Sequence, residues 1–173
     1  MKSLLGLLGR FSALRAFGLI SVLALCTQTR ALDLSLANLG AIVTQGSGKS
    51  TVVDLTENPD GTISLAAEQS GHLSHLGHFT GSFDYLATID YNTGTTFIGG
   101  DGVIRLAAGE LFVSVQIVEV GIDYPRPYTG FLKITSGTGR FASARGVFEI
   151  TGVDEESLTD GFVLTGVVLN AAK

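Results

Sequence analysis

Three charged side chains lie within β-rich, mostly apolar segments, where a closed interior would make them acids, bases or anion partners. Glu119 follows the same alternation parity as the apolar residues of Leu111–Ile117, while Glu149 and Arg105 each have β-branched neighbours. A charged group buried among apolar residues has a shifted pKa and can act as a general acid, a general base or an oxyanion partner. Glu119, Glu149 and Arg105 are therefore the candidate catalytic residues, provided that the fold turns them inward.

Three histidines, His72, His75 and His78, recur at every third position. On a helix this spacing would gather the imidazoles on one face, as a metal site requires. On a strand, alternation directs His75 away from the other two. Because the segment is rich in glycine and serine and leads into a strand, we interpret the histidines as polar residues at a strand rim. We expect no metal and no other cofactor.

The glycine-rich segment Gly46–Thr51 resembles the end of a phosphate-binding loop. The complete motif needs a glycine where this chain has Val43, and a helix where Thr51–Leu55 is β-like. We interpret this segment as a glycine–serine turn and expect no nucleotide.

These side chains need elements to position them, and the chain from residue 50 onward is typical of consecutive short strands. Period-two alternation is clearest over Phe79–Tyr91, with aromatic and aliphatic residues on one face and polar residues on the other. Turn-forming residues separate the strands. The other β-rich segments are Ser50–Leu55, Thr62–Ala67, Val103–Leu106, Glu110–Ile122, Tyr128–Thr135, Gly146–Val153 and Phe162–Leu169, and the turns are placed at Asn58–Gly61, Asn92–Gly94, Gly99–Gly102, Ala108–Glu110 and Asp123–Pro127.

About eight strands with short links predict an all-β fold, and we expect an antiparallel, approximately eight-stranded closed barrel rather than a sandwich. Within Glu110–Ile122 the apolar residues change parity after Ile117. This change predicts a bulge or a bend near Ile117, a feature that barrels use to curve.

The N-terminal residues predict an export signal. Basic residues precede an apolar run, Ala16–Cys26, which is shorter than the about 20 residues that span a bilayer. Small residues at Thr29 and Ala31 favour cleavage after Ala31. We therefore expect a signal peptide over residues 1–31, a lead-in segment over residues 32–49, a barrel domain over residues 50–173, and a periplasmic or extracellular location. An anchor that stays attached is the alternative.

Cys26 is the one cysteine of the chain. Leu23–Cys26 partly fits a bacterial lipidation site, although Leu25, the residue before the cysteine, is not small. A mature domain that begins after Ala31 has no cysteine, which excludes disulfides, thiolate nucleophiles and cysteine-ligated zinc.

Charge and composition exclude further classes of partner. The chain has 16 acidic and 11 basic residues and a net charge of −5, and loss of the basic signal would make the mature domain more acidic. A nucleic-acid partner is not expected for such a chain. Tryptophan is absent and aromatic residues make up 8%, which argues against a barrel that spans a membrane.

A dense motif lies near the C-terminus, over Ile134–Gly146. Its glycines permit a sharp turn, and its phenylalanine offers a ring to plug a barrel end. The segment resembles the G-[TS]-G-x-F-x-x-A-x-G signature of plant dirigent proteins and the similar one of allene oxide cyclases. The resemblance covers about forty residues, Phe131–Leu169, and implies an eight-stranded antiparallel barrel with an apolar cavity, often trimeric and without a cofactor. The matching residues are Gly137, Thr138, Gly139, Phe141, Ala144 and Gly146.

Three functions follow as alternatives. The first is a barrel that binds an apolar or aromatic small molecule, as a dimer or trimer or as a single chain. The second is a cofactor-free cyclase or isomerase in the same cavity, which needs an inward charged group. The third is a structural or envelope-associated barrel with a filled interior, because an eight-stranded barrel can be filled or hold one small ligand. The residues that we expect to line a cavity are Phe83, Tyr85, Val113, Val115 and Leu132.

Overall fold

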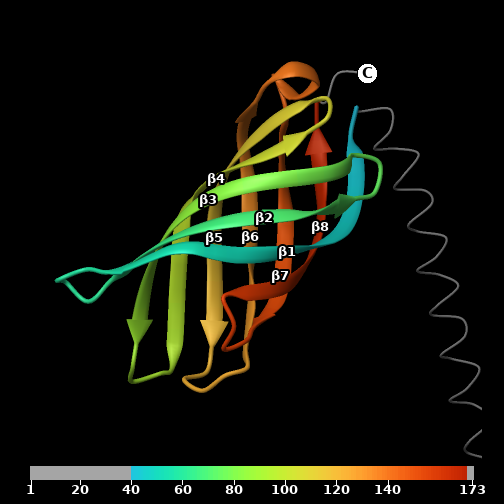
Figure 1. The fold of residues 1–173 in the computed structure, drawn as a ribbon. Coiled ribbons are helices and arrows are strands. Elements are labelled where there is room, and N and C mark those ends of the chain that lie inside the picture. The colour runs from blue at the N-terminus through green and yellow to red at the C-terminus, as the bar shows by residue number, and fades with distance from the viewer. Residues whose placement is uncertain (1–39, 171–173) are drawn as a thin grey trace, which may run out of the picture. The chain divides into compact units, whose positions relative to one another are not determined.

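The computed structural model describes residues 40–170, which form eight antiparallel strands closed into a barrel (Figure 1). Each strand pairs with the next one along the chain, and β8 pairs with β1. The prediction of an all-β, eight-stranded antiparallel barrel is therefore confirmed. The strands are β1 (Ile42–Glu57), β2 (Ile63–Leu73), β3 (Gly77–Asp90), β4 (Thr95–Leu106), β5 (Gly109–Val120), β6 (Arg126–Gly137), β7 (Arg145–Asp154) and β8 (Thr159–Leu169), with a short 3₁₀ helix η1 (Gly139–Phe141) between β6 and β7.

The strands are longer than the sequence predicts because glycine-rich segments lie inside them. β1 begins at Ile42, so the second part of the expected lead-in over residues 32–49 belongs to the barrel and pairs with β8. Gly46–Thr51 is the middle of β1, not a turn, and Gly99–Gly102 is the middle of β4, not a turn. The predicted loop Asp123–Pro127 also ends early, because β6 starts at Arg126.

The inward glycines accommodate aromatic rings from neighbouring strands. A Cβ atom on Gly102 would lie 2.1 Å from Cδ1 of Phe83, which is directly opposite on β3. A Cβ atom on Gly48 would lie 2.5 Å from Cζ of Phe162 on β8. Rings placed over glycines fill the space that the missing side chains leave and let the sheet curve tightly. The same arrangement joins Phe79 with Gly71, Phe148 with Gly166, and Tyr128 with Gly152.

From the change of apolar parity in β5, the sequence predicts a bulge or a bend near Ile117. The structure has no bulge at this position. The register with β4 and β6 runs unbroken from Val113 to Glu119, and the shift lies instead between Phe112 and Val113. Alternation continues, so that Glu119 is buried and Val120 is exposed. The apolar pattern changes because the interior itself becomes polar at this end of the strand.

One end of the barrel is plugged by η1 and its flanking residues. Phe141 is 1% exposed and Ala144 is fully buried, and both belong to the main hydrophobic core. Gly139 has φ +56°, which favours glycine, and a Cβ atom on Gly137 would lie 2.4 Å from the carbonyl oxygen of Phe141. The Thr138 hydroxyl accepts a hydrogen bond from the Glu110 N–H. The motif over residues 137–146 thus forms a barrel plug, as its glycines and its phenylalanine predict.

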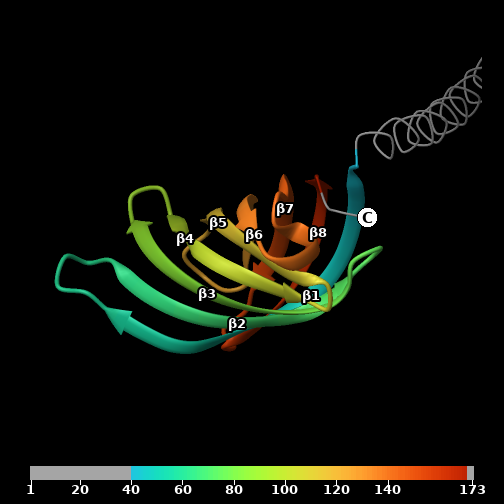
Figure 2. The ribbon, with the colours of Figure 1, turned by 90° about the horizontal axis from the view of Figure 1, so that it is seen from above.

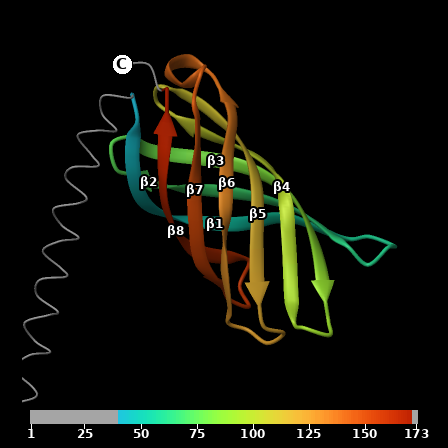
Figure 3. The ribbon, with the colours of Figure 1, turned by 180° about the vertical axis from the view of Figure 1, so that it is seen from behind.

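The opposite end carries the β3–β4, β5–β6 and β7–β8 connections, which lie below the barrel in Figure 1. The view from above shows the strands curving around the interior, with the β1–β2 hairpin extending outward (Figure 2). From behind, β5 to β8 form one continuous wall (Figure 3). Side chains from all eight strands line the candidate site.

Filling an inward glycine position should destabilise the protein, and β4 offers a matched control. We expect Gly102→Ala to lower the free energy of unfolding by about 1–3 kcal/mol, because the new methyl group overlaps the Phe83 ring. Gly99→Ala, on the same strand with no atom within 4 Å of its Cβ position, should change stability by at most about 1 kcal/mol. Urea denaturation measures both, and equal effects would contradict the ring-over-glycine packing.

Candidate functional site

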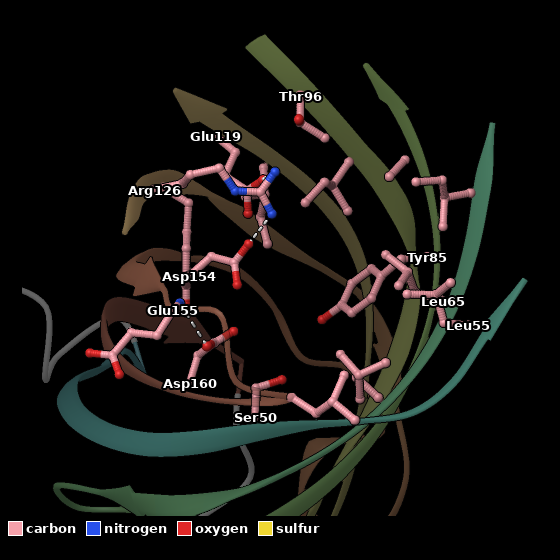
Figure 4. A pocket seen from close by; sticks show the side chains of 18 of the residues that line it. Ser50, Leu55, Leu65, Tyr85, Thr96, Glu119, Arg126, Asp154, Glu155 and Asp160 are labelled. Carbon is pink, nitrogen blue, oxygen red and sulfur yellow. Dashed lines mark hydrogen bonds and ion pairs between the residues drawn. The ribbon is translucent and has the colours of Figure 1, made fainter. Parts of the chain in front are cut away.

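The unplugged half of the barrel is hollow. A cavity of about 310 Å³ lies between the strands at the end opposite η1 (Figure 4). Of the 24 residues that line it, 11 are aliphatic and 13 are polar, charged or tyrosine, and the polar groups gather on two sides of the cavity. The aliphatic lining residues are Val52, Leu55, Ile63, Leu65, Ala67, Ala87, Ile89, Ile98, Ile117, Ile150 and Leu158.

Three charged side chains from neighbouring strands meet on one wall of the cavity. Glu119 is near the end of β5, Arg126 begins β6 and Asp154 ends β7. The pairing of these strands places Arg126 opposite Asp154, and alternation turns all three side chains inward. Nη1 of Arg126 lies 3.4 Å from Oε2 of Glu119, and Nη2 of Arg126 donates a hydrogen bond to Oδ2 of Asp154. One guanidinium thus bridges two carboxylates.

Burial perturbs the titration of this cluster. The Glu119 side chain is only 7% exposed, and burial raises the pKa of Glu119 to about 7, since the opposing effect of Arg126 is partly cancelled by Asp154 and Asp160. The pKa of Asp160, at the start of β8, is also raised, mainly by burial. Burial raises the pKa of the Tyr128 hydroxyl as well. Near neutral pH, Glu119 is therefore able both to hold and to release a proton.

Arg126 remains charged in this setting. Burial by itself would lower the pKa of Arg126, but the hydrogen bond to Asp154 and the charge of Glu119 raise it. The guanidinium also lies 4.3 Å from the ring centroid of Tyr124, whose hydroxyl accepts a hydrogen bond from Nη2. Two carboxylates thus share the terminal nitrogens of Arg126, whereas its Nε–H is buried and has no hydrogen-bond partner among the described residues.

A second polar group lies on the other side of the cavity, on β1, β2 and β3. Figure 4 shows the Tyr85 side chain pointing into the cavity toward the wall that carries Arg126. Nε2 of Gln69 donates a hydrogen bond to the Tyr85 hydroxyl at 3.2 Å and lies 3.5 Å from the Ser50 hydroxyl. The Tyr85 ring stacks on Phe83 at 5.7 Å between centroids, which holds the ring in place.

Of the three candidate catalytic residues, the structure turns only Glu119 into the interior. Glu149 lies on the outer face of β7 and is exposed. Arg105 is exposed on the outer face of β4, where it pairs with Glu110 at 3.5 Å and donates a hydrogen bond to Ser82. The condition for a catalytic role is therefore not met by Glu149 or Arg105, because alternation places both on the solvent side of their strands.

Of the five expected cavity residues, only Tyr85 lines the cavity. The other four are buried, as expected of inward residues, but they belong to the packed half of the barrel, where aromatic rings and the η1 plug fill the interior. These four residues are Phe83, Val113, Val115 and Leu132.

The three histidines lie outside the cavity. His72 and His78 face each other across β2 and β3 with 5.0 Å between ring centroids, and His75 lies in the connecting turn with φ +64°. Over residues 40–170, the structure brings together no three histidine, cysteine or acidic side chains that could hold a metal ion.

Sequence reasoning missed Arg126, Asp154, Asp160 and Gln69. Arg126 lies between two prolines and was assigned to a loop, and the acids Asp154 and Asp160 fall next to the β7–β8 connection. The available signal was a change from apolar to charged residues at inward positions of neighbouring strand ends. This pattern can be recognised only once the strand register is known.

Comparison of the chain with protein-family models, with curated proteins and with solved structures finds no match. The resemblance of residues 131–169 to dirigent proteins and allene oxide cyclases therefore stays a prediction. Within the described part of the chain, no helix has the length and hydropathy needed to cross a bilayer. The predicted signal peptide, its cleavage after Ala31 and the lipidation of Cys26 lie outside the described residues.

The raised pKa of Glu119 predicts a stability that falls with rising pH. Below about pH 4.5 the carboxyl is protonated in both the folded and the unfolded states; between there and about pH 7 the unfolded state ionises first, so the folded state loses stability. The difference in unfolding free energy between the wild type and Glu119→Gln should therefore change over this range. Urea denaturation across the pH range measures this difference. The exposed Glu149→Gln variant is the control, and parallel profiles for the wild type and Glu119→Gln would contradict the prediction.

Proposed function

We propose that this protein is an exported barrel that binds an apolar small molecule in the cavity that strands β1 to β8 enclose. The observation that carries the proposal is the asymmetry of the interior: one half is filled by phenylalanine rings and the η1 plug, whereas the other half is hollow, with aliphatic side chains between two groups of polar ones. The cavity volume of about 310 Å³ lies at the lower end of the about 300–1,000 Å³ typical of ligand pockets.

The charged groups of the cavity argue against an anionic ligand. Arg126 is shared between Glu119 and Asp154, and three further acids, Glu155, Glu156 and Asp160, also line the cavity. A carboxylate ligand would meet these acids with only Arg126 to balance the negative charge. The aliphatic wall would supply most of the affinity through burial of the ligand's apolar surface.

Export is supported by the sequence alone. The apolar run Ala16–Cys26, the basic residues before it and the small residues at Thr29 and Ala31 are the support for this part of the proposal. N-terminal sequencing of the protein from its host's exported fraction tests it.

Filling the cavity should block binding. Ala87 lines the cavity, whereas the adjacent Leu86 points outward and is half-exposed. We expect Ala87→Phe to weaken binding of the neutral fluorophore N-phenyl-1-naphthylamine at least about tenfold, or ~1.4 kcal/mol, because the ring occupies ligand space. Leu86→Phe should bind as the wild type does. Fluorescence titration measures both, and native mass spectrometry of the exported protein identifies a retained ligand.

Thermal melts of the two variants provide the control for folding. Ala87→Phe should melt no lower than the wild type if the ring fills empty space. A wild type that binds neither the fluorophore nor any retained molecule would contradict the proposal and favour a structural role for the barrel.

A cofactor-free isomerase or cyclase is the second candidate function. Glu119 is the observation that favours it, because a buried carboxyl with a pKa of about 7 on a cavity wall suits proton transfer to and from a bound molecule. Arg126, 3.4 Å away, would stabilise the carboxylate after the proton leaves.

Proton transfer predicts isotope exchange into the ligand. In deuterium oxide, the molecule retained by the exported protein should gain carbon-bound deuterium when incubated with the wild type. Glu119→Gln should lose the exchange while still binding, and the outward Glu149→Gln should retain it. Mass spectrometry of the extracted ligand measures this. Binding without exchange in the wild type would leave the barrel as a binding protein.

A further inference from the structure

The inner polar group of the cavity contains an unpaired buried amide. Gln69 is 5% exposed and lines the cavity. Its Nε2 donates to the Tyr85 hydroxyl, but its Oε1 is buried and has no hydrogen-bond partner among the described residues. A buried acceptor without a partner is costly and uncommon in native proteins. Within the described residues, the chain therefore supplies no partner for this atom.

The unpaired position does not depend on which way the amide is turned. Turning the Gln69 amide over would let Oε1 accept hydrogen bonds from the Tyr85 and Ser50 hydroxyls, but the amide nitrogen would then be the unpaired group. In both orientations one polar atom of Gln69 is left for a ligand. The Tyr85 hydroxyl is adjacent to it in both.

The Tyr85 hydroxyl is a second polar group with unused hydrogen-bonding capacity. With Nε2 of Gln69 facing it, the Tyr85 hydroxyl accepts a hydrogen bond and its own hydrogen is available for another acceptor. With the amide turned over, the hydroxyl would donate to Oε1, and its oxygen would be available for another donor. Burial raises the pKa of Tyr85 above its ordinary value of 10.0, so the hydroxyl stays neutral. Stacking on Phe83 and the direction of the side chain into the cavity fix where it points (Figure 4).

We propose that Gln69 and Tyr85 form a subsite for a hydroxyl group, and that the ligand of the cavity is a neutral apolar alcohol. This inference rests on the proposed binding function and specifies its ligand class. A hydroxyl donates one hydrogen bond and accepts others, so it satisfies the unpaired Gln69 atom and the Tyr85 hydroxyl together. The hydrocarbon part of the ligand then lies against the aliphatic wall formed by residues such as Ile98 and Ile117.

Other head groups fit the subsite less well. A hydrocarbon leaves the Gln69 atom unpaired, as it is without a ligand. With Oε1 unpaired, a carboxylate has only acceptors and leaves Oε1 unpaired, and an ammonium has only donors and leaves the Tyr85 hydrogen unused. With the amide turned over, an ammonium leaves the amide nitrogen unpaired, and a carboxylate is disfavoured by the acids that line the cavity. Both ions would also lose hydration on entering the cavity.

A set of ligands with one chain length tests the subsite. Octane, 1-octanol, octanoate and octylamine compete against N-phenyl-1-naphthylamine for the full-length mature protein. In the double variant Gln69→Leu/Tyr85→Phe both polar partners are removed, and 1-octanol should bind about tenfold more weakly than it binds the wild type, which corresponds to two lost hydrogen bonds. Octane should bind the variant as tightly as the wild type or more tightly.

Several outcomes would overturn the inference. The inference is wrong if the double variant loses affinity for octane and 1-octanol equally, or for neither. It is also wrong if octanoate or octylamine binds the wild type most tightly. Each of these outcomes leaves the proposed binding function intact. Displacement by none of the four, together with no binding of the fluorophore, would remove the proposed function as well. If the double variant does not fold in a thermal melt, Gln69→Leu is used alone, with a smaller expected loss for 1-octanol and none for octane.

Discussion

The packing of aromatic rings over glycines on neighbouring strands is the constraint on which the rest of the structure depends. Phe83 over Gly102 and Phe162 over Gly48 bring the sheet into tight curvature, so that a barrel of eight strands closes around a dense interior at one end. Along β3 the inward residues change from phenylalanine to Tyr85 and then to Ala87. The cavity begins where the large rings end, because the smaller side chains no longer fill the interior.

The polar groups of the cavity are held by the same frame. Arg126 joins the ends of β5, β6 and β7 through its two carboxylate partners, and the network offsets part of the desolvation cost of each ion. On the other side, Tyr85 is both the last stacked ring of the packed half and the first polar group of the hollow half. The cavity is thus continuous with the packed core of the barrel.

The architecture was predictable from local patterns, and part of the site was too. The alternation in β3 and the glycine-rich plug around Phe141 indicated an eight-stranded antiparallel barrel, and the parity of Glu119 indicated an inward carboxyl. The inward glycines of β1 and β4 misled the prediction, because a glycine opposite a ring on another strand has the same local signature as a glycine in a turn. Glu149 and Arg105 became candidates because their sequence neighbours are apolar, but the structure places both on the outer face. Apolar sequence neighbours do not reveal which face of a strand is buried.

The sequence by itself determined the fold class, the plug at one end and the inward direction of Glu119, since each depends on residues close together in the chain. Only the tertiary structure decided that the barrel is hollow at the other end, that Arg126 bridges Glu119 and Asp154, and that Gln69 reaches Tyr85 with one amide atom unpaired. The physical reason is that these contacts join different strands. Their geometry follows from strand register and barrel closure, which no single segment of the sequence specifies.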